Sequence, residues 1–297
     1  MTKLRVELPE ALAEISAKAF LAQQGISHTQ WKRIKQHGNF CVNGEPAIAT
    51  RVTLKNGDII SYDIEKTSDI IPEELPLDIR YEDKYLLIIN KPAGQLVHPT
   101  TAEAHGTLGN AVLAHFQALG LPLSYHPVHR LDRFTSGLVL IAKQPQVQYL
   151  LTTRDGNKKF HRSYLAICTG KPEPPNGLID APIARALPSI IERKVSAEGQ
   201  PARTHYETLA SNGNLSLLRL WLETGRTHQI RVHLAHLGHP LIGDDLYGGS
   251  LKLIKRQALH AYRLHFVHPL TNKEIDIHAP LPADMEKICK ENNFQNF

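Results

Sequence analysis

The sequence predicts an α+β protein whose main sheet is mixed and largely antiparallel. From Ile79 onward, strand-like and helical stretches alternate without the regular strand–helix–strand repeat that a parallel sheet requires. The composition, with 42% hydrophobic and 21% charged residues, is that of an ordinary globular protein. Strands are predicted at residues 85–90, 138–142, 163–168, 204–209, 215–223, 262–267 and 274–278, and helices at 107–119, 144–153 and 227–237.

A smaller α+β unit is predicted ahead of this sheet. Residues 9–24 are rich in Ala, Leu and Glu at helical spacing, and residues 29–37 predict a short basic helix that ends at Gly38. The pair Asn43-Gly44 is a strong tight-turn signal, and residues 59–62 then read as a strand. Two small helices followed by a turn-rich β segment therefore precede the main sheet.

The chain divides into three stretches. Its 297 residues favour about two domains. Residues 66–78 contain prolines and acids without a clear hydrophobic period, so we expect a linker there. The smaller domain then spans residues 1–65 and the larger domain spans residues 79–297.

The distribution of charge favours a polyanionic partner. The formal net charge of +5 and the pI of about 9.0 are mild and exclude little. Basic residues, however, cluster at residues 32–35, 158–162 and 226–233, beside the sharpest sequence motifs. Such clusters are typical of nucleic-acid binding, so we expect RNA as the partner.

Several features favour a cytoplasmic protein. No apolar run reaches the roughly 18 residues that a membrane span needs, and the N-terminus lacks the apolar core of a signal peptide. Cys41, Cys168 and Cys289 are far apart and odd in number, which favours neither a disulfide framework nor a thiolate metal site. We expect a monomer in a reducing cytoplasm.

One carboxylate stands between two guanidinium groups. Asp132 lies between Arg130 and Arg133, and a Thr-Ser-Gly turn signal separates it from the apolar run of residues 138–142. Asp132 should therefore lie on a loop at the end of a core strand, where catalytic groups are often displayed. The flanking arginines should keep it ionised. The triplet alone also fits a surface ion cluster that contributes little stability.

Ordered motifs resemble those of the RluA family of RNA pseudouridine synthases. The most specific reads His-Arg-Leu-Asp-x-x-Thr-Ser-Gly-Leu and contains Asp132. The resemblance covers roughly residues 79–283 and implies the pseudouridine synthase fold, a mixed sheet with a central cleft. The matching stretches are residues 87–99, 129–138, 162–166, 224–234 and 259–269.

The resemblance implies an isomerase that converts uridine in RNA to pseudouridine. It implies that Asp132 is the catalytic carboxylate, that Tyr164 stacks on the target base, and that Arg231 pairs with Asp132. These residue types suit these roles, because tyrosine offers a flat ring and a guanidinium can grip a carboxylate with two hydrogen bonds. Attack on C1′, attack on the base and proton removal all stay open for Asp132. The reaction needs no cofactor, and the sequence contains no GxGxxG or Walker motif.

RNA contacts are also expected. The resemblance implies that Arg130 fills the gap left by the extruded base, whose extrusion costs a few kcal/mol. Leu234 follows Arg231 by three residues, so it could wall the uracil pocket or pack in the core. His129 is a further predicted RNA contact, and phosphate contact or support of the scaffold is expected of Lys91, Lys143, Arg226 and His228.

The N-terminal domain resembles the S-four-type RNA-binding module of ribosomal proteins. The resemblance rests on its two small helices and on the later Val-Asn-Gly and Gly-Asp-Ile-Ile segments, and Lys32, Arg33 and Lys35 are its predicted RNA contacts. The module favours ribosomal RNA over transfer RNA as the substrate, and both stay open. The alternative is a small appendage that does not contact RNA.

Two other classes of function compete with the isomerase. One is a non-catalytic RNA-binding or ribosome-assembly protein on the same fold, which would have no need for an intact catalytic trio. The other is a metallohydrolase, because His233, His236 and His239 are spaced by three residues and could share a helix face. Arg226 and Arg231 would repel a divalent cation there, so we expect no metal.

Overall fold

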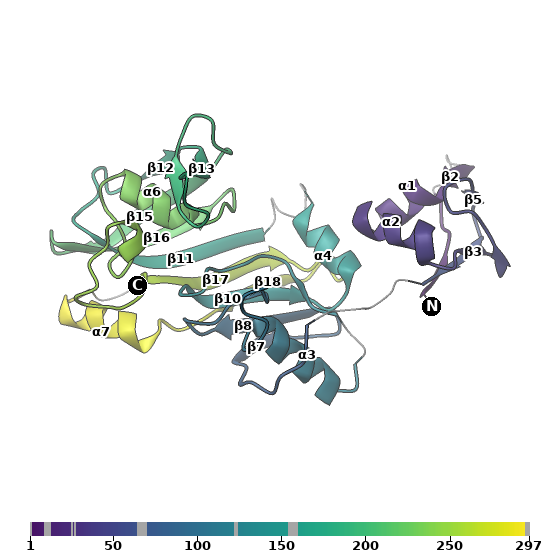
Figure 1. Cartoon of the computed structure of the whole chain (residues 1–297), viewed down its shortest axis with the longest axis horizontal. Helices are drawn as coiled ribbons and strands as arrows, with labels where there is room; N and C mark the ends of the chain where they lie inside the picture. Colours follow the sequence, from purple (N-terminus) through teal and green to yellow (C-terminus); the bar gives the residue numbers. More distant parts are fainter. Residues whose placement is uncertain are drawn as a thin grey trace.

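The protein is described by a computed structural model that covers residues 2–8, 13–24, 26, 28–63, 70–121, 124–153 and 160–294. Lys158, Lys159 and the first part of the predicted linker lie outside these residues. A four-stranded sheet and two helices form the N-terminal part, and a ten-stranded sheet forms most of the rest (Figure 1). The predicted α+β class with a largely antiparallel main sheet is confirmed. None of the described helices is long and apolar enough to cross a bilayer.

The N-terminal sheet has the strand order β1-β6-β3-β4, and a separate pair joins β2 to β5. The predicted helix at residues 9–24 begins only at Ala17, because residues 14–16 form a strand and the Ser16 side chain caps the helix by accepting a hydrogen bond from the Ala19 N–H. Residues 9–12 lie outside the described part. The elements are β1 (Thr2–Arg5), β2 (Glu14–Ser16), α1 (Ala17–Gln23), α2 (His28–His37), β3 (Cys41–Val42), β4 (Glu45–Pro46), β5 (Thr53–Lys55) and β6 (Ile59–Tyr62).

An apolar core holds the N-terminal helices against the strands. Trp31 and Ile34 of α2 are buried in it, whereas Lys32, Arg33 and Lys35 lie on the exposed face of the helix. The predicted turn at residues 43–44 is present, with both residues at positive φ.

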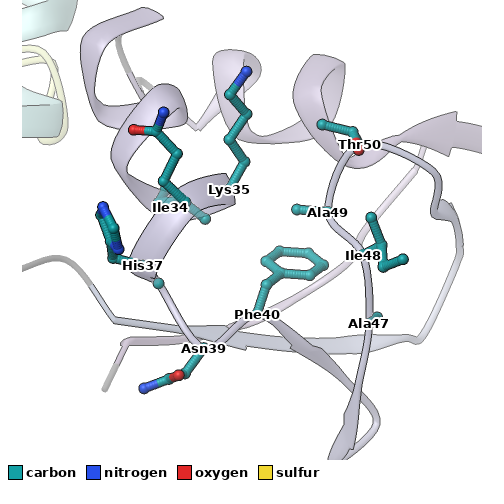
Figure 2. Close-up of a pocket in the computed structure, with 11 residues that line it drawn as sticks. Ile34, Lys35, His37, Asn39, Phe40, Ala47, Ile48, Ala49 and Thr50 are labelled. Atoms are coloured by element: carbon teal, nitrogen blue, oxygen red, sulfur yellow. The ribbon is translucent and has the colours of Figure 1, made fainter.

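The N-terminal part also contains a cavity of about 230 Å³ beside the end of α2. Figure 2 shows the Phe40 ring between the end of this helix and the segment of residues 47–50.

The main sheet follows the order β12-β15-β16-β11-β17-β10-β8-β7, with β18 paired to β17 and β9 paired to β10. Among the described pairs, β10 with β17 is parallel and the others are antiparallel. All seven predicted strands are present. The strands are β7 (Ile79–Glu82), β8 (Leu86–Lys91), β9 (His126–Pro127), β10 (Ser136–Ala142), β11 (Phe160–Thr169), β12 (Asn176–Asp180), β15 (Arg203–Ser211), β16 (Leu215–Leu222), β17 (Leu259–Val267) and β18 (Glu274–His278).

The three predicted helices of this part are present, and two of them have a local reason for their start. Thr107 and Asn110 form a capping box at α3 (Leu108–Ala118). Proline occupies the first turn of α4 (Pro145–Thr152), where its missing N–H costs nothing. His228, at φ 58°, precedes α6 (Gln229–His236). A fourth helix, α7 (Ala283–Glu291), was not predicted, and its buried side chains join an apolar cluster beneath β11 and β16.

The described part of the predicted linker has no regular element, but it packs on the larger sheet. The side chains of Ile70 and Leu77 lie against the main core. The Asn110 side chain donates to the Ile71 carbonyl, and the Glu73 carboxylate accepts from the Gly106 N–H. Residues 70–78 are therefore held to the larger part of the chain, and the predicted domain boundaries stay a prediction.

A glycine allows the closest strand contact beside the Asp132 loop. Gly137 has φ +113°, and a Cβ atom added to it would lie 2.3 Å from the Ala261 carbonyl oxygen. Gly137 pairs with Ala261 on β17, and Ala261 pairs with Tyr164 on β11. The three residues thus form one row across the sheet, which places the loop before β10 beside Tyr164.

Gly137→Ala should lower the thermal unfolding midpoint. The change adds the strain of a positive φ, about 1–3 kcal/mol, and a clash with the backbone of β17. Gly213→Ala is the matched control, because Gly213 has φ +88° and nothing lies within 4 Å of its Cβ position. Melting followed by circular dichroism should show a larger fall for Gly137→Ala, and equal falls in the two variants would contradict the proposed contact.

Candidate active site

The Asp132 side chain lies on a short, anchored loop before β10. The Thr135 N–H donates to the Asp132 carbonyl at 3.1 Å, and the neighbouring Leu131 side chain is buried in the core. The Asp132 side chain is 27% exposed. Its carboxylate can therefore meet a ligand while its backbone stays fixed.

Arg231 brings a cation to this carboxylate from the buried face of α6. Its Nη1 lies 3.3 Å from Asp132 Oδ2, although 99 residues separate the two in sequence. The Arg231 side chain is only 8% exposed. The predicted pairing of Arg231 with Asp132 is thus present in the geometry.

Arg231 forms its bidentate ion pair with a different carboxylate. Its Nε and Nη2 donate to the two oxygens of Asp244 at 2.7 and 2.8 Å, and Asp244 is almost completely buried. Asp132 receives only the remaining Nη1, so the expectation that the guanidinium fork grips Asp132 itself was wrong. Burial lowers the pKa of Arg231, but the hydrogen bonds and charge of Asp244 outweigh it and the net pKa is raised. Asp244 therefore fixes both the charge and the direction of Arg231.

A hydrogen-bonded chain supports the other side of Asp132. The backbone N–H of Arg193 donates to the Tyr247 hydroxyl at 3.0 Å, and the same hydroxyl is hydrogen-bonded to His228 Nδ1 at 2.8 Å. The other ring nitrogen of His228, Nε2, lies 3.9 Å from Asp132 Oδ1. Burial lowers the pKa of His228, and the charge of Asp132 only partly offsets this. The Tyr247 ring also covers the Arg231 guanidinium, at 5.0 Å from ring centre to guanidinium carbon.

Tyr164 lies next to this cluster on β11. The strand has a register shift between Ser163 and Tyr164, and such a bulge re-aims a side chain. Burial raises the pKa of the Tyr164 hydroxyl, with Arg162 opposing and Asp132 adding to the effect. Leu234 is fully buried in the same apolar cluster as Tyr164.

The two arginines next to Asp132 in the sequence are not the ones that the structure pairs with its carboxylate. Arg133 donates to Glu103 at 2.7 Å and to the Gly94 carbonyl at 3.1 Å. Arg130 is exposed. Burial lowers the pKa of His98, and the nearby charge of Arg130 lowers this pKa further. In the part of the chain that the structure describes, the cation paired with Asp132 is Arg231, and His228 lies 3.9 Å from the other carboxylate oxygen.

Three predicted RNA contacts are buried and belong to the scaffold. Lys91 is fully buried, and its ammonium group donates to the carbonyls of Pro92, Gln95 and Arg133. Burial lowers the pKa of Lys91 to about 7, although the charge of Asp132 opposes this. Donation to three carbonyls at once requires the protonated ammonium group.

The Lys143 ammonium lies 2.6 Å from Glu82, and the side chain is 5% exposed. His129 Nε2 accepts from the Leu140 N–H within the core. With Lys91, these groups are turned inward, so the geometry favours a scaffold role over a direct RNA contact.

Two other predicted contacts of this domain, Arg130 and Arg226, are accessible. Arg130 is exposed beside the Asp132 loop. Arg226 is exposed at the start of α6, where it donates to the Pro201 carbonyl and to the Gln200 side chain.

Two of the three regularly spaced histidines, His233 and His239, are already hydrogen-bonded. His233 Nε2 donates to the Ala181 carbonyl at 2.9 Å, and its Nδ1 accepts from the Thr204 hydroxyl at 2.8 Å. His239 Nδ1 donates to the Thr169 carbonyl. Neither nitrogen of His233 can ligate a metal without losing one of these bonds, so the geometry gives the metallohydrolase no support. Among the described residues, no group of three His, Cys, Asp or Glu side chains is placed to hold a metal ion.

Asp244 and Tyr247 were not predicted as site residues. They lie on the loop Gly-Asp-Asp-Leu-Tyr-Gly-Gly, whose last part is the short 3-10 helix η1 (Asp245–Tyr247). The glycines of this loop were the sequence feature that could have pointed to it. The structure shows why glycine is needed, because a Cβ atom at Gly243 or Gly249 would lie 1.9 Å from a backbone oxygen. Such close backbone approaches indicate a loop folded into the core.

The comparisons with known proteins agree with this geometry. A family model described as RNA pseudouridylate synthase matches residues 85–236. The RNA pseudouridine synthase YjbO of Bacillus subtilis, named as uncharacterized, is 41% identical over 283 residues, which cover 94% of this chain and 100% of the relative. Ribosomal large subunit pseudouridine synthase D of Pasteurella multocida is 38% identical over 306 residues, which cover 98% of this chain and 92% of the relative.

A solved structure supports the fold. The structure titled human RNA pseudouridylate synthase domain containing 4 matches with a TM-score of 0.60 and 24% identity, over 72% of this chain and 92% of that chain. The matched family span contains the Asp132 loop, Tyr164 and Arg231. The chain therefore belongs to the RNA pseudouridylate synthase family and is an isomerase that acts on RNA.

Proposed function

We propose that Asp132 is the carboxylate with which this enzyme converts specific uridines of structured RNA into pseudouridine. The observation that carries the proposal is the contact of Asp132 with a buried arginine, 3.3 Å away, that a second buried carboxylate holds in place. One anion is thus presented at a partly exposed position within a cationic frame. A polyanionic substrate can approach this frame, because Arg231 and the exposed Arg130 offset the negative charge of Asp132.

The reaction that this site would perform is balanced without a co-reactant. The bond between uracil N1 and ribose C1′ breaks, the base turns, and a bond forms between C5 and C1′. The proton that leaves C5 is matched by a proton that arrives at N1. Attack on C1′, attack on the base and removal of a proton all use the same carboxylate, and Arg231 would hold it in position.

Tyr164 and Leu234 would form the wall of the uracil pocket. Tyr164 lies in the same row of the sheet as Gly137, which starts the strand after the Asp132 loop. Its burial keeps the hydroxyl protonated, so the ring would act as a flat neutral surface against the base. Stacking on an aromatic ring contributes about 1–3 kcal/mol per base.

Arg130 would take the place of the extruded base. It is exposed and lies two residues before Asp132, so a base that enters the pocket passes close to it. A planar cation can stack in the vacancy and contact phosphate at the same time.

We propose large-subunit ribosomal RNA as the substrate. Relatives that are 36% to 39% identical, from five bacteria, carry the name ribosomal large subunit pseudouridine synthase D. We further propose that the N-terminal part acts as an S-four-type module, with Lys32, Arg33 and Lys35 on the RNA-facing side of α2. A map of pseudouridine in cellular RNA with and without this protein tests the target, and loss of sites only from transfer RNA would overturn it.

Asp132→Asn should bind RNA but form no measurable pseudouridine. The amide keeps the shape of the side chain, but it cannot act as a base or a nucleophile, and a catalytic base accounts for about 10²–10⁴ in rate. Product should be followed by chemical tagging, because the isomerisation does not change mass. Asp245→Asn, an exposed acid on the Asp244 loop, is the control and should stay near wild type. Activity of Asp132→Asn within about tenfold of wild type would be incompatible with the assigned role.

Asp244→Asn should lower kcat more than it changes KM. The substitution removes the charged partner that aims Arg231, while the RNA-binding surface is untouched. Removing one partner of a buried ion pair costs about 3–5 kcal/mol, so the melting midpoint should fall as well. Rates are therefore compared at saturating RNA and at a temperature where circular dichroism shows the variant to be folded. A folded variant with unchanged kcat would show that Asp244 only supports the fold.

Replacing Lys32, Arg33 and Lys35 together with Gln should weaken RNA binding and reduce its dependence on salt. Each lost phosphate contact flattens the slope of log affinity against log salt by about 0.7–0.9. The control replaces Lys273, Lys287 and Lys290, three exposed lysines at the other end of the chain, and removes the same charge. Equal slopes for the two triple variants would reject an RNA-binding role for α2.

A further inference from the structure

An ordered hairpin presents aliphatic side chains to solvent. Strands β13 (Ile183–Arg185) and β14 (Arg193–Val195) pair in antiparallel fashion, and residues 186–192 form the tip. Leu187, Ile190 and Ile191 on this tip are 83%, 77% and 59% exposed. The first two exceed every other exposed large apolar side chain in the part of the chain that the structure describes. Three such residues on one short loop are unusual, although single exposed aliphatic residues are common.

The tip has a fixed internal structure. Arg193 Nη1 donates to the carbonyls of Ile190, Ile191 and Glu192 at 2.9–3.2 Å. The Ser189 hydroxyl accepts from the N–H groups of Ile191 and Glu192 at 3.2 and 3.0 Å. These bonds use the polar groups of the loop and leave its aliphatic side chains outside. A preorganised protrusion loses little conformational entropy when a ligand binds.

The base of this hairpin is continuous with the Asp132 site. The Arg193 N–H donates to the Tyr247 hydroxyl, which in turn contacts His228 beside Asp132. Val195 and Tyr247 pack against one apolar cluster with Val232 of α6. Figure 1 shows β13 beside α6. A ligand that lies over the Asp132 loop is therefore adjacent to the hairpin.

The charge of the hairpin suits a polyanion. Arg185 and Arg193 are direct cross-strand partners, and like charges in this position are destabilising. Lys194, next to Arg193, is exposed, and Glu192 is the one acid on the tip. The aliphatic tip thus extends from positively charged strands. This arrangement suits RNA, whose charged phosphates lie outside and whose stacked bases lie inside.

We propose that the tip residues Leu187, Ile190 and Ile191 form a wedge that enters the base stack of the substrate RNA beside the target uridine. Apolar side chains are the wedges that open base steps in other nucleic-acid complexes. The wedge would hold the neighbouring bases apart while the uridine is extruded, and the arginines below it would contact the flanking phosphates. This inference rests on the proposed function, because it names the part of the substrate that the hairpin contacts.

The test replaces Leu187, Ile190 and Ile191 together with Ser in the full-length protein. The matched control replaces Leu119, Leu253 and Leu270, which are 52%, 55% and 46% exposed elsewhere on the surface. Pseudouridine formation is measured on two short RNAs with the same target uridine. In one RNA the uridine lies in a helical stem, and in the other an internal loop leaves its neighbours unstacked.

We expect kcat/KM on the helical RNA to fall at least about tenfold in the tip variant, with a much smaller loss on the loop RNA. The control variant should follow wild type on both. A 2-aminopurine base next to the target should brighten when the helical RNA binds wild-type protein, and should not brighten with the tip variant. This signal needs no turnover, so it tests the wedge separately from the proposed chemistry.

Several results would overturn the wedge. They are equal losses on the two RNAs, a tip variant that matches the control, or a 2-aminopurine signal that survives the tip substitutions. Sedimentation that shows wild type as a dimer and the tip variant as a monomer would instead assign the tip to contact between copies of the chain. Failure of the proposed function has a different signature, because wild-type protein would then form no pseudouridine on either RNA.

Discussion

The pairing of Arg231 with Asp244 is the interaction on which the site depends. Two hydrogen bonds between buried charged groups fix the guanidinium, and its one remaining terminal nitrogen faces Asp132. A buried arginine without such a partner would be strongly unfavourable, so this geometry has few alternatives. The same arginine lies under the Tyr247 ring, which connects it to His228 and to the β13–β14 hairpin. One ion pair thus links the catalytic loop, α6 and the η1 loop.

The sheet supplies the second constraint. The contact of β10 with β17 requires glycine at position 137, and the shared register places Tyr164 in the same row. The Asp132 loop and the aromatic side chain therefore occupy fixed positions before any RNA arrives. Such preorganisation favours catalysis, because the carboxylate and the pocket need little rearrangement when the base enters.

Much of the fold could be predicted from the sequence, because the spacing of apolar residues along a strand or helix follows which side chains face the core. The seven predicted strands and the helices near residues 108, 145 and 229 are present, whereas short edge strands such as β12 and the helix α7 carried too weak a pattern. The pairing of Asp132 with Arg231 came from the motif resemblance. Asp244 could not be inferred in the same way, because only the tertiary fold shows which acid a buried arginine meets. A lysine in a motif does not reveal its own burial either, so the sequence could not decide between phosphate contact and scaffold support for Lys91, which the structure buries.

The most direct test of the account measures hydrogen loss from C5 of uridine. Ribosomal RNA that carries tritium at C5 is incubated with the wild-type protein and no added cofactor, and released tritium is compared with pseudouridine formed. We predict one tritium released for each pseudouridine, because the carbon that loses its hydrogen is the one that joins C1′. Release without pseudouridine, or no release from RNA that the protein binds, would contradict it.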